Sequence, residues 1–256
     1  MLTLAKNVIK RLRTQGLFFT LWLIGARTRA LIRSFVEDRR RGLSTARVVK
    51  KQEPEIEDAR CHWYVATDYE TFHLAMDQVL IRPGEDIFVD FGSGKGRIVL
   101  LAAELPFRRV IGVEFSKQLH DVALENLRGA LPGLNCKDVE LLLADATQWK
   151  VPDEATVLFF FNPFHGDVLA KVFANIRRSL EEAPRKITIV YVRPEKFFEK
   201  EIAWQEWLTR KTELACLEGK VAIYESKTGQ PNGSAGCIGV REDNSRAQES
   251  LGTPLR

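Results

Sequence analysis

The stretch Phe88–Arg97, with the sequence FVDFGSGKGR, decides the fold of this chain. Its first half is an apolar run of strand length that contains Asp90, and its second half turns through Gly92, Gly94 and Gly96 into a segment with helical spacing. Glycine suits such a turn because it adopts positive φ angles and, having no Cβ, lets a ligand approach the backbone. The first amides of the following helix would face that ligand. The stretch therefore predicts a strand, a ligand-binding loop and a helix.

The chain beyond Asp86 alternates between short apolar runs and helical patterns. Strands are predicted at Ile87–Phe91, Arg109–Val113, Val139–Leu143, Val157–Phe161 and Ile187–Val192. Helices are predicted between them at Arg97–Glu104, Lys117–Leu131 and Asp167–Glu182. This alternation indicates an α/β fold, with a mostly parallel sheet covered by helices on both faces. Two further extended runs, Thr212–Leu217 and Val221–Glu225, predict a pair of strands at the sheet edge.

Composition is that of a soluble globular protein, with 45% hydrophobic and 28% charged residues and a net charge of +4. We divide the chain into a basic helical segment (1–50), a polar linker (51–66), an α/β domain (67–225) and a disordered tail (226–256). Within the domain, Thr67 and Glu70 predict a capping box that starts a helix. The four cysteines are scattered without metal-ligand spacing, so we expect no metal site and a reducing, cytoplasmic location.

The amino-terminal segment is basic and free of acid. No Asp or Glu occurs from Met1 to Val36, whereas seven residues there are Lys or Arg. The uncharged run from Thr14 to Ala26 is shorter than the ~20 apolar residues of a membrane-spanning helix. We predict an amphipathic helix, ending near Gly42, that packs on the domain or lies on a membrane surface; a transit peptide is a further alternative.

Acidic residues follow three successive strands of the predicted sheet. Asp90 lies two residues before the first loop glycine, Glu114 ends the second strand, and Asp145 follows the third. The carboxyl ends of parallel strands form the ligand-binding edge of an open α/β sheet. The loop spacing is G-x-G-x-G, whereas dinucleotide-binding loops have G-x-G-x-x-G. An acid at Asp90 also suits a cationic ligand better than a pyrophosphate.

These motifs resemble those of class I S-adenosylmethionine-dependent methyltransferases, over roughly Thr67 to Glu225. The resemblance implies a Rossmann-like, seven-stranded sheet whose last strand is antiparallel. It also implies that S-adenosylmethionine is the cofactor and that Glu114 binds its ribose and Asp145 its adenine. The cofactor-binding loop would comprise Asp90, Gly92, Ser93, Gly94 and Gly96.

The fourth strand ends in Asn162-Pro163-Phe164, which looks like the Asn/Asp-Pro-Pro-Tyr/Phe signature of amino-directed methyltransferases. In that signature the amide and a backbone carbonyl accept hydrogen bonds from the target nitrogen. The resemblance makes these three residues the catalytic candidates and favours a nitrogen acceptor over oxygen or carbon. This chain departs from the signature in having a single proline, and a Pro-stabilised turn is the alternative. His165 is either a general base or a surface residue without a role.

The loop is also similar to those of poorly characterised bacterial methyltransferases and of protein-lysine methyltransferases with an Asp-x-Gly-Ser-Gly-x-Gly-Arg motif. This closer resemblance makes protein lysine a candidate acceptor. It also makes Tyr64, Thr67 and Tyr69, which precede the first strand, candidates for cofactor or substrate contact. Lys95 and Arg97 are expected to help order the loop.

Two other functions remain open on the sequence. A non-catalytic module would bind S-adenosylmethionine or a nucleotide and dock through the basic amino-terminal helix. An NAD-dependent oxidoreductase would also use Glu114, although the glycine spacing and Asp90 argue against it. Nucleic acid is not indicated as a partner, because no basic-aromatic stripe accompanies the predicted sheet.

Overall fold

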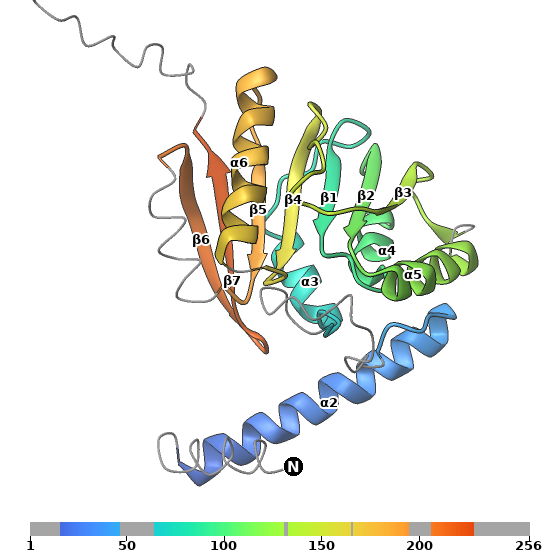
Figure 1. Cartoon of the computed structure of the whole chain (residues 1–256). Helices are drawn as coiled ribbons and strands as arrows, with labels where there is room; N and C mark the ends of the chain where they lie inside the picture. The colour runs from blue at the N-terminus through green and yellow to red at the C-terminus, as the bar shows by residue number, and fades with distance from the viewer. Residues whose placement is uncertain (1–15, 47–63, 131–132, 165, 195–205, 228–256) are drawn as a thin grey trace, which may run out of the picture.

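A computed structural model describes residues 16–46, 64–130, 133–164, 166–194 and 206–227. Its centre is one seven-stranded sheet with the strand order β3-β2-β1-β4-β5-β7-β6 (Figure 1). Strand β7 runs antiparallel to its neighbours β5 and β6, and the other adjacent pairs are parallel. The strands are β1 (Ile87–Phe91), β2 (Arg109–Glu114), β3 (Val139–Leu143), β4 (Ala155–Phe161), β5 (Thr188–Val192), β6 (Leu208–Cys216) and β7 (Gly219–Ser226).

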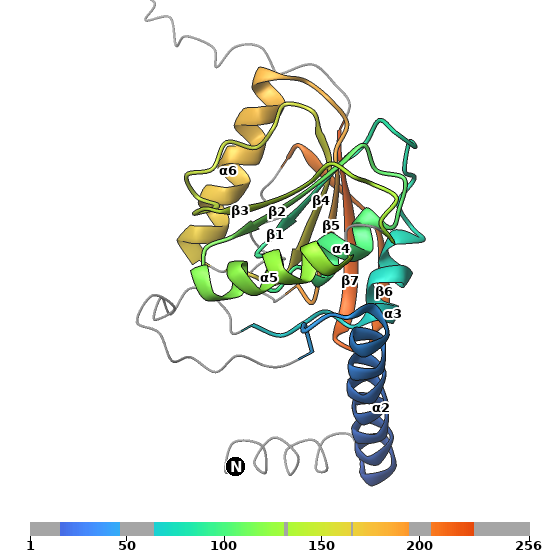
Figure 2. The same ribbon diagram turned by 90° about the vertical axis from the view of Figure 1, so that its right-hand side faces the viewer.

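Helices cover both faces of the sheet (Figure 2). Helix α6 (Gly166–Glu182) packs on one face, against side chains that include Val89 of β1 and Phe160 of β4. Helices α3 (Tyr69–Met76) and α4 (Arg97–Ala103) pack on the other face, against side chains that include Phe88 and Phe159. Helix α5 (Lys117–Ala130) lies beside β3 and β2. Successive residues of β1 and of β4 thus pack into the hydrophobic cores on opposite faces of the sheet, as the two-residue period of a strand requires.

The fold predicted from the sequence is confirmed, including the antiparallel last strand. The predicted bounds of β1 and β3 are those of the structure, whereas β6 begins at Leu208, four residues before the predicted start. The capping box was wrong in its first residue. Helix α3 is capped by Asp68, whose side chain accepts hydrogen bonds from the amides of Glu70 and Thr71. An aspartate is at least as good an N-cap as a threonine, which explains the shift by one residue.

The amino-terminal helix is α2 (Leu17–Arg41), which extends away from the α/β domain at its amino-terminal end (Figures 1 and 2). It ends as expected at Gly42, which has the left-handed φ of 68°. Among the described residues, no helix is long and apolar enough to cross a membrane. Most of the proposed linker and tail, together with residues 1–15, lies outside the described residues.

Candidate active site

A cavity of about 350 Å³ opens at the carboxyl ends of β1, β2, β3 and β4. This is the edge at which an open α/β sheet binds its ligand. Nine of the ten predicted site residues line it; the tenth, Gly96, begins α4 with a φ of 82°. The nine are Asp90, Gly92, Ser93, Gly94, Glu114, Asp145, Asn162, Pro163 and Phe164.

Asp90 places a buried carboxyl group in the cavity wall. Burial raises the pKa of this carboxyl well above its ordinary value of 3.8, and the nearby negative charge of Glu114 raises it further. A bound cation would offset both effects, because an opposite charge favours the ionised carboxylate. The site therefore has the electrostatics of a receptor for a positive group.

Glu114 joins the end of β2 to the glycine loop. Its Oε2 atom accepts a hydrogen bond of 2.7 Å from the amide of Gly94, and Oε1 accepts one of 2.8 Å from the amide of Ser116. Burial nevertheless raises the pKa of this carboxyl, although those amides act to lower it. A carboxylate has about four lone-pair sites, so each oxygen retains capacity for a ligand hydroxyl. Glu114 thus positions the loop and can still bind a ribose.

The glycine loop is held by contacts that a side chain would prevent. A Cβ atom at Gly92 would lie 2.7 Å from Cβ of Pro163, and one at Gly94 would lie 2.3 Å from the ring of Tyr64. Both glycines also have positive φ angles, of 77° and 54°. The loop after β1 is therefore in direct contact with the loop after β4 and with the segment before α3.

Asp145 occupies a more open part of the cavity. Its side chain is exposed, and Oδ1 accepts a hydrogen bond of 2.8 Å from the amide of Thr147. This contact is typical of an Asx turn, in which a short acid stabilises its own loop. Asp145 therefore has a structural role as well as a place at the cavity.

Asn162 lies at the end of β4 with a strained backbone. It is buried, and its φ of 41° is uncommon for a residue other than glycine. Behind it, the rings of Phe91, Phe160 and Tyr191 stack across three neighbouring strands, with centroid separations of 4.7 and 5.4 Å. The Tyr191 hydroxyl donates a long hydrogen bond of 3.5 Å to Oδ1 of Asn162. The aromatic stack thus supports the side chain that faces the cavity.

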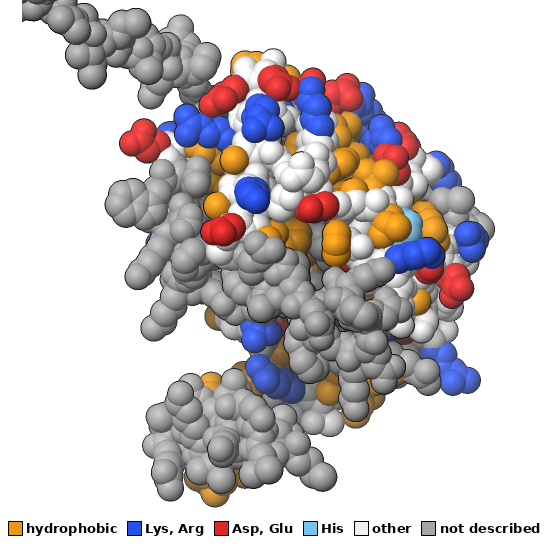
Figure 3. Space-filling view, viewed as in Figure 1, with side chains coloured by type: hydrophobic (Ala, Val, Ile, Leu, Met, Phe, Trp, Pro, Cys, Tyr) orange, Lys and Arg blue, Asp and Glu red, His pale blue; other side chains and the backbone are white. Residues whose placement is uncertain are grey.

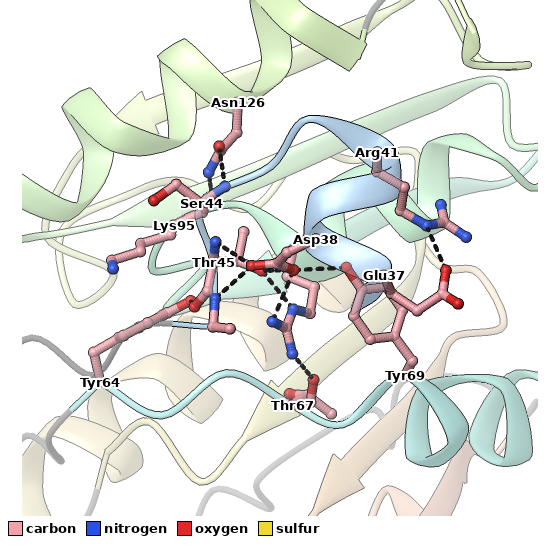
Figure 4. A network of polar contacts seen from close by, with 12 residues as sticks. Glu37, Asp38, Arg41, Ser44, Thr45, Tyr64, Thr67, Tyr69, Lys95 and Asn126 are labelled. Carbon is pink, nitrogen blue, oxygen red and sulfur yellow. Dashed lines mark hydrogen bonds and ion pairs between the residues drawn. The ribbon is translucent and has the colours of Figure 1, made fainter. Parts of the chain in front are cut away.

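A buried network joins α2 to the start of α4 (Figure 4). Arg97 Nη2 forms an ion pair of 3.0 Å with Oδ1 of Asp38, and its Nε donates to the hydroxyl of Thr45. Asp38 also accepts hydrogen bonds from the amides of Thr45 and Ala46 and from the hydroxyl of Tyr69. Burial alone would raise the pKa of Asp38, but the charge of Arg97 and these hydrogen bonds hold it below its usual range.

The same network reaches the cavity through the residues before α3. Arg97 Nη1 donates to the carbonyl of Thr67, and the Tyr64 hydroxyl donates to the carbonyl of Thr45. Asn126 links the network to the glycine loop, because it accepts from the amide of Ser44 and donates to the carbonyl of Lys95. The carboxyl-terminal end of α2 is thus part of the framework of the site.

The structure separates the three residues singled out before the first strand. Tyr64 and Thr67 line the cavity, whereas Tyr69 is buried outside it, against Asp38 and Arg97. Sequence reasoning missed Phe115 and Lys171, which also line the cavity. The position of Phe115, directly after the acid that ends β2, was a usable signal; Lys171 lies on α6 and had none. His165 lies outside the described residues.

Comparison with known proteins gives the class of this domain. Residues 88–183 match the family model of a methyltransferase domain. No curated protein is a match for the sequence. These residues therefore resemble a methyltransferase domain, and the match, together with the seven-stranded fold and its cavity, supports S-adenosylmethionine-dependent methyl transfer as the activity.

Several solved structures resemble the chain at low identity. An RNA methyltransferase from Salinibacter ruber, in complex with S-adenosyl-L-homocysteine, is 22% identical, with a TM-score of 0.45, over 66% of this chain and 97% of its own. A precorrin-6y C5,15-methyltransferase from Geobacter metallireducens is 14% identical, with a TM-score of 0.49, over 68% and 96%. A ribosomal protein L11 methylase from Lactobacillus delbrueckii is 13% identical, with a TM-score of 0.46, over 62% and 77%.

Proposed function

We propose that this methyltransferase acts on a nitrogen atom and that its acceptor is the side chain of a protein lysine. The observation that carries the proposal is the buried, positive-φ Asn162 in the wall of the cavity that also holds Asp90 and Glu114. Strained backbone is retained where the surrounding structure maintains it, commonly at functional sites.

The residues present fit the methyl donor. S-adenosylmethionine supplies an electrophilic methyl group on a sulfonium centre and carries a cationic amino group. We assign Asp90 to that amino group, because its buried carboxyl is compensated by a cation. Glu114 has lone pairs left for the ribose hydroxyls, and Asp145 is assigned to the adenine amino group at the open end of the cavity.

The loop after β4 suits a nitrogen acceptor because of its hydrogen-bonding groups. A neutral primary amine has two N–H donors and one lone pair. The side-chain oxygen of Asn162 and a neighbouring backbone carbonyl would accept from both donors and leave the lone pair free for transfer. Phe164 packs beside this position in the cavity wall. Rate enhancement then comes chiefly from positioning.

The test is methyl transfer by the full-length chain from radiolabelled S-adenosylmethionine to proteins of a cell extract, followed by acid hydrolysis and amino-acid analysis. We expect label in methylated lysine that resists mild alkali. Asn162→Ala should bind the donor with unchanged affinity in calorimetry and transfer at least ~100-fold more slowly, the usual minimum loss for a group that stabilises a transition state. Alkali-labile label, or label only in nucleic acid or small molecules, would refute the proposed acceptor.

A further inference from the structure

Helix α2 carries an apolar stripe that the protein leaves exposed. Its residues have the three- and four-residue spacing of one helix face, with a gap at Thr28, and each residue is between 46% and 57% accessible to solvent. They are Leu17, Leu21, Ile24, Leu31 and Phe35. Exposed apolar surface of this extent on a soluble protein commonly marks an interaction site.

The stripe is exposed although its spacing continues into the contact with the α/β domain. Asp38 lies seven residues after Leu31 and three after Phe35, on the same side of the helix, and it carries the contacts to Arg97. Figure 2 shows the amino-terminal end of α2 pointing away from the sheet and its helices. The stripe therefore needs a partner outside this domain.

The charges around the stripe favour an anionic partner. Arg27 lies along one edge of it and Arg29 lies toward the other, and the sequence has no acid before Glu37; Arg33 instead pairs with Glu70 of α3. Exposed Trp22 lies close to the Arg29 edge. A helix with an apolar face, flanking arginines and an exposed tryptophan is typical of one that lies in a membrane interface. By contrast, acidic and basic side chains are intermixed over the upper face of the α/β domain (Figure 3).

A second copy of the chain is a weaker candidate for the partner. The stripe has the 4,3,4 spacing of a coiled-coil seam, but the 25 residues of α2 amount to fewer than four heptads, and Thr28 interrupts the seam. Coiled coils also use opposite charges beside the seam to select their partner. Two copies of α2 would bring only arginines together along the acid-free length.

We propose that α2 binds the surface of an anionic lipid membrane, with its apolar stripe in the headgroup–acyl boundary and Arg27 and Arg29 facing lipid phosphates. This inference does not depend on the acceptor of the methyl group. It places the methyltransferase site beside a membrane, because the carboxyl-terminal end of the same helix holds Arg97 at the start of α4.

Vesicle co-sedimentation of the full-length protein tests the proposal. We expect binding to vesicles of equal parts phosphatidylcholine and phosphatidylglycerol, weaker binding at high salt, and little binding to phosphatidylcholine alone. Each basic residue near an anionic surface contributes about fivefold to binding, so Arg27→Glu/Arg29→Glu should reduce it at least ~10-fold. The matched charge control is the exposed Arg128→Glu on α5, which should bind as the wild type does.

The apolar stripe is tested in the same assay. Leu21→Ser/Leu31→Ser should reduce vesicle binding by at least ~10-fold, because each buried leucine contributes about tenfold or more to transfer from water. Leu80→Ser, at an exposed leucine of the α/β domain, is the matched control and should have no effect. Unchanged donor affinity would show that the variants are folded. The proposal is overturned by an absence of vesicle binding, or by a dimer in sedimentation velocity that the leucine variant dissociates.

Discussion

At the scale of single residues, Asp90 lowers the stability of the ligand-free protein and is expected to bind the cationic cofactor. Its carboxyl is buried at the end of β1, and both burial and Glu114 raise its pKa above the ordinary 3.8. A raised pKa means that the folded protein binds the proton more tightly than the unfolded chain does. The stabilisation is complete below pH 3.8 and is lost as the pH rises through the folded pKa. At neutral pH this carboxyl therefore destabilises the ligand-free protein, whether it is ionised or takes up a proton.

Removal of this charge should change stability and cofactor binding in opposite directions. Asp90→Asn should raise the melting temperature of the ligand-free protein at neutral pH, because a neutral amide avoids the cost both of ionising a buried carboxyl and of protonating it above its ordinary pKa. The same change should weaken binding of S-adenosylmethionine by ~10- to 100-fold, since a hydrogen bond to a charged group contributes about 1.5–3 kcal/mol. Thermal denaturation and calorimetric titration measure the two effects. A variant that is less stable but binds normally would show that Asp90 has a structural role instead.

At the scale of elements, a buried ion pair between Asp38 and Arg97 connects α2 to α4. Asp38 and Arg97 are 4% and 3% exposed, so each charge depends on the other for compensation. Such a pair contributes modestly to stability compared with apolar packing, but loss of one partner leaves an uncompensated buried charge. The pair therefore fixes the position of α2 more than it drives folding.

Asp38→Asn tests this ion pair, because aspartate and asparagine side chains have nearly the same shape. We expect a loss of ~3–5 kcal/mol in the free energy of unfolding at neutral pH, the usual effect of breaking a buried ion pair. The pKa of Asp38 is lowered by folding, so its contribution is present above its ordinary value of 3.8 and is lost as the pH falls through the folded pKa. The variant should therefore approach the wild type in acid. Urea denaturation at several pH values measures this.

The control for that experiment is the preceding residue. Glu37 is partly exposed and forms ion pairs with Arg40 and Arg41 at the helix surface. Exposed pairs of this kind contribute less than about 1 kcal/mol, so Glu37→Gln should change stability little. Equal losses in the two variants would mean that the Asp38–Arg97 contact does not fix the helix.

The contact between Asp38 and Arg97 is also a feature that the sequence does not predict. The strands of the sheet and the loop from Asp90 to Gly96 were predictable because apolar period, glycine spacing and strand-end acids are local patterns. The contact between Asp38 and Arg97 joins residues 59 positions apart, and neither has a pattern that names its partner. The packing of Tyr64 on Gly94 and the backbone strain at Asn162 are likewise products of tertiary structure.

At the scale of the whole molecule, α2 is one helix with two environments. Its last turns, around Asp38, are fixed to the framework of the methyltransferase site, and Arg41 forms an ion pair with Glu104 at the end of α4. Its first turns present Leu17, Leu21 and Ile24 to solvent. If the first part of α2 binds a membrane and the second part positions the site, amino-terminal deletions of different lengths should separate the two roles.

Two truncations make that separation. Removal of residues 1–27 deletes most of the apolar stripe but leaves Arg33, which pairs with Glu70, and the Asp38 network. Removal of residues 1–46 also deletes Asp38 and Thr45, and leaves Arg97 buried without its counter-charge. We expect the shorter deletion to abolish vesicle binding and to keep donor affinity within about twofold of the full-length chain. The longer deletion should cost ~3–5 kcal/mol of stability and lose donor binding, although every residue assigned to the donor is still present. Calorimetry and vesicle co-sedimentation are measured on both truncated proteins. Normal donor binding after the longer deletion would show that α2 is not part of the framework of the site. Loss of donor binding after the shorter deletion would show that the whole helix is needed.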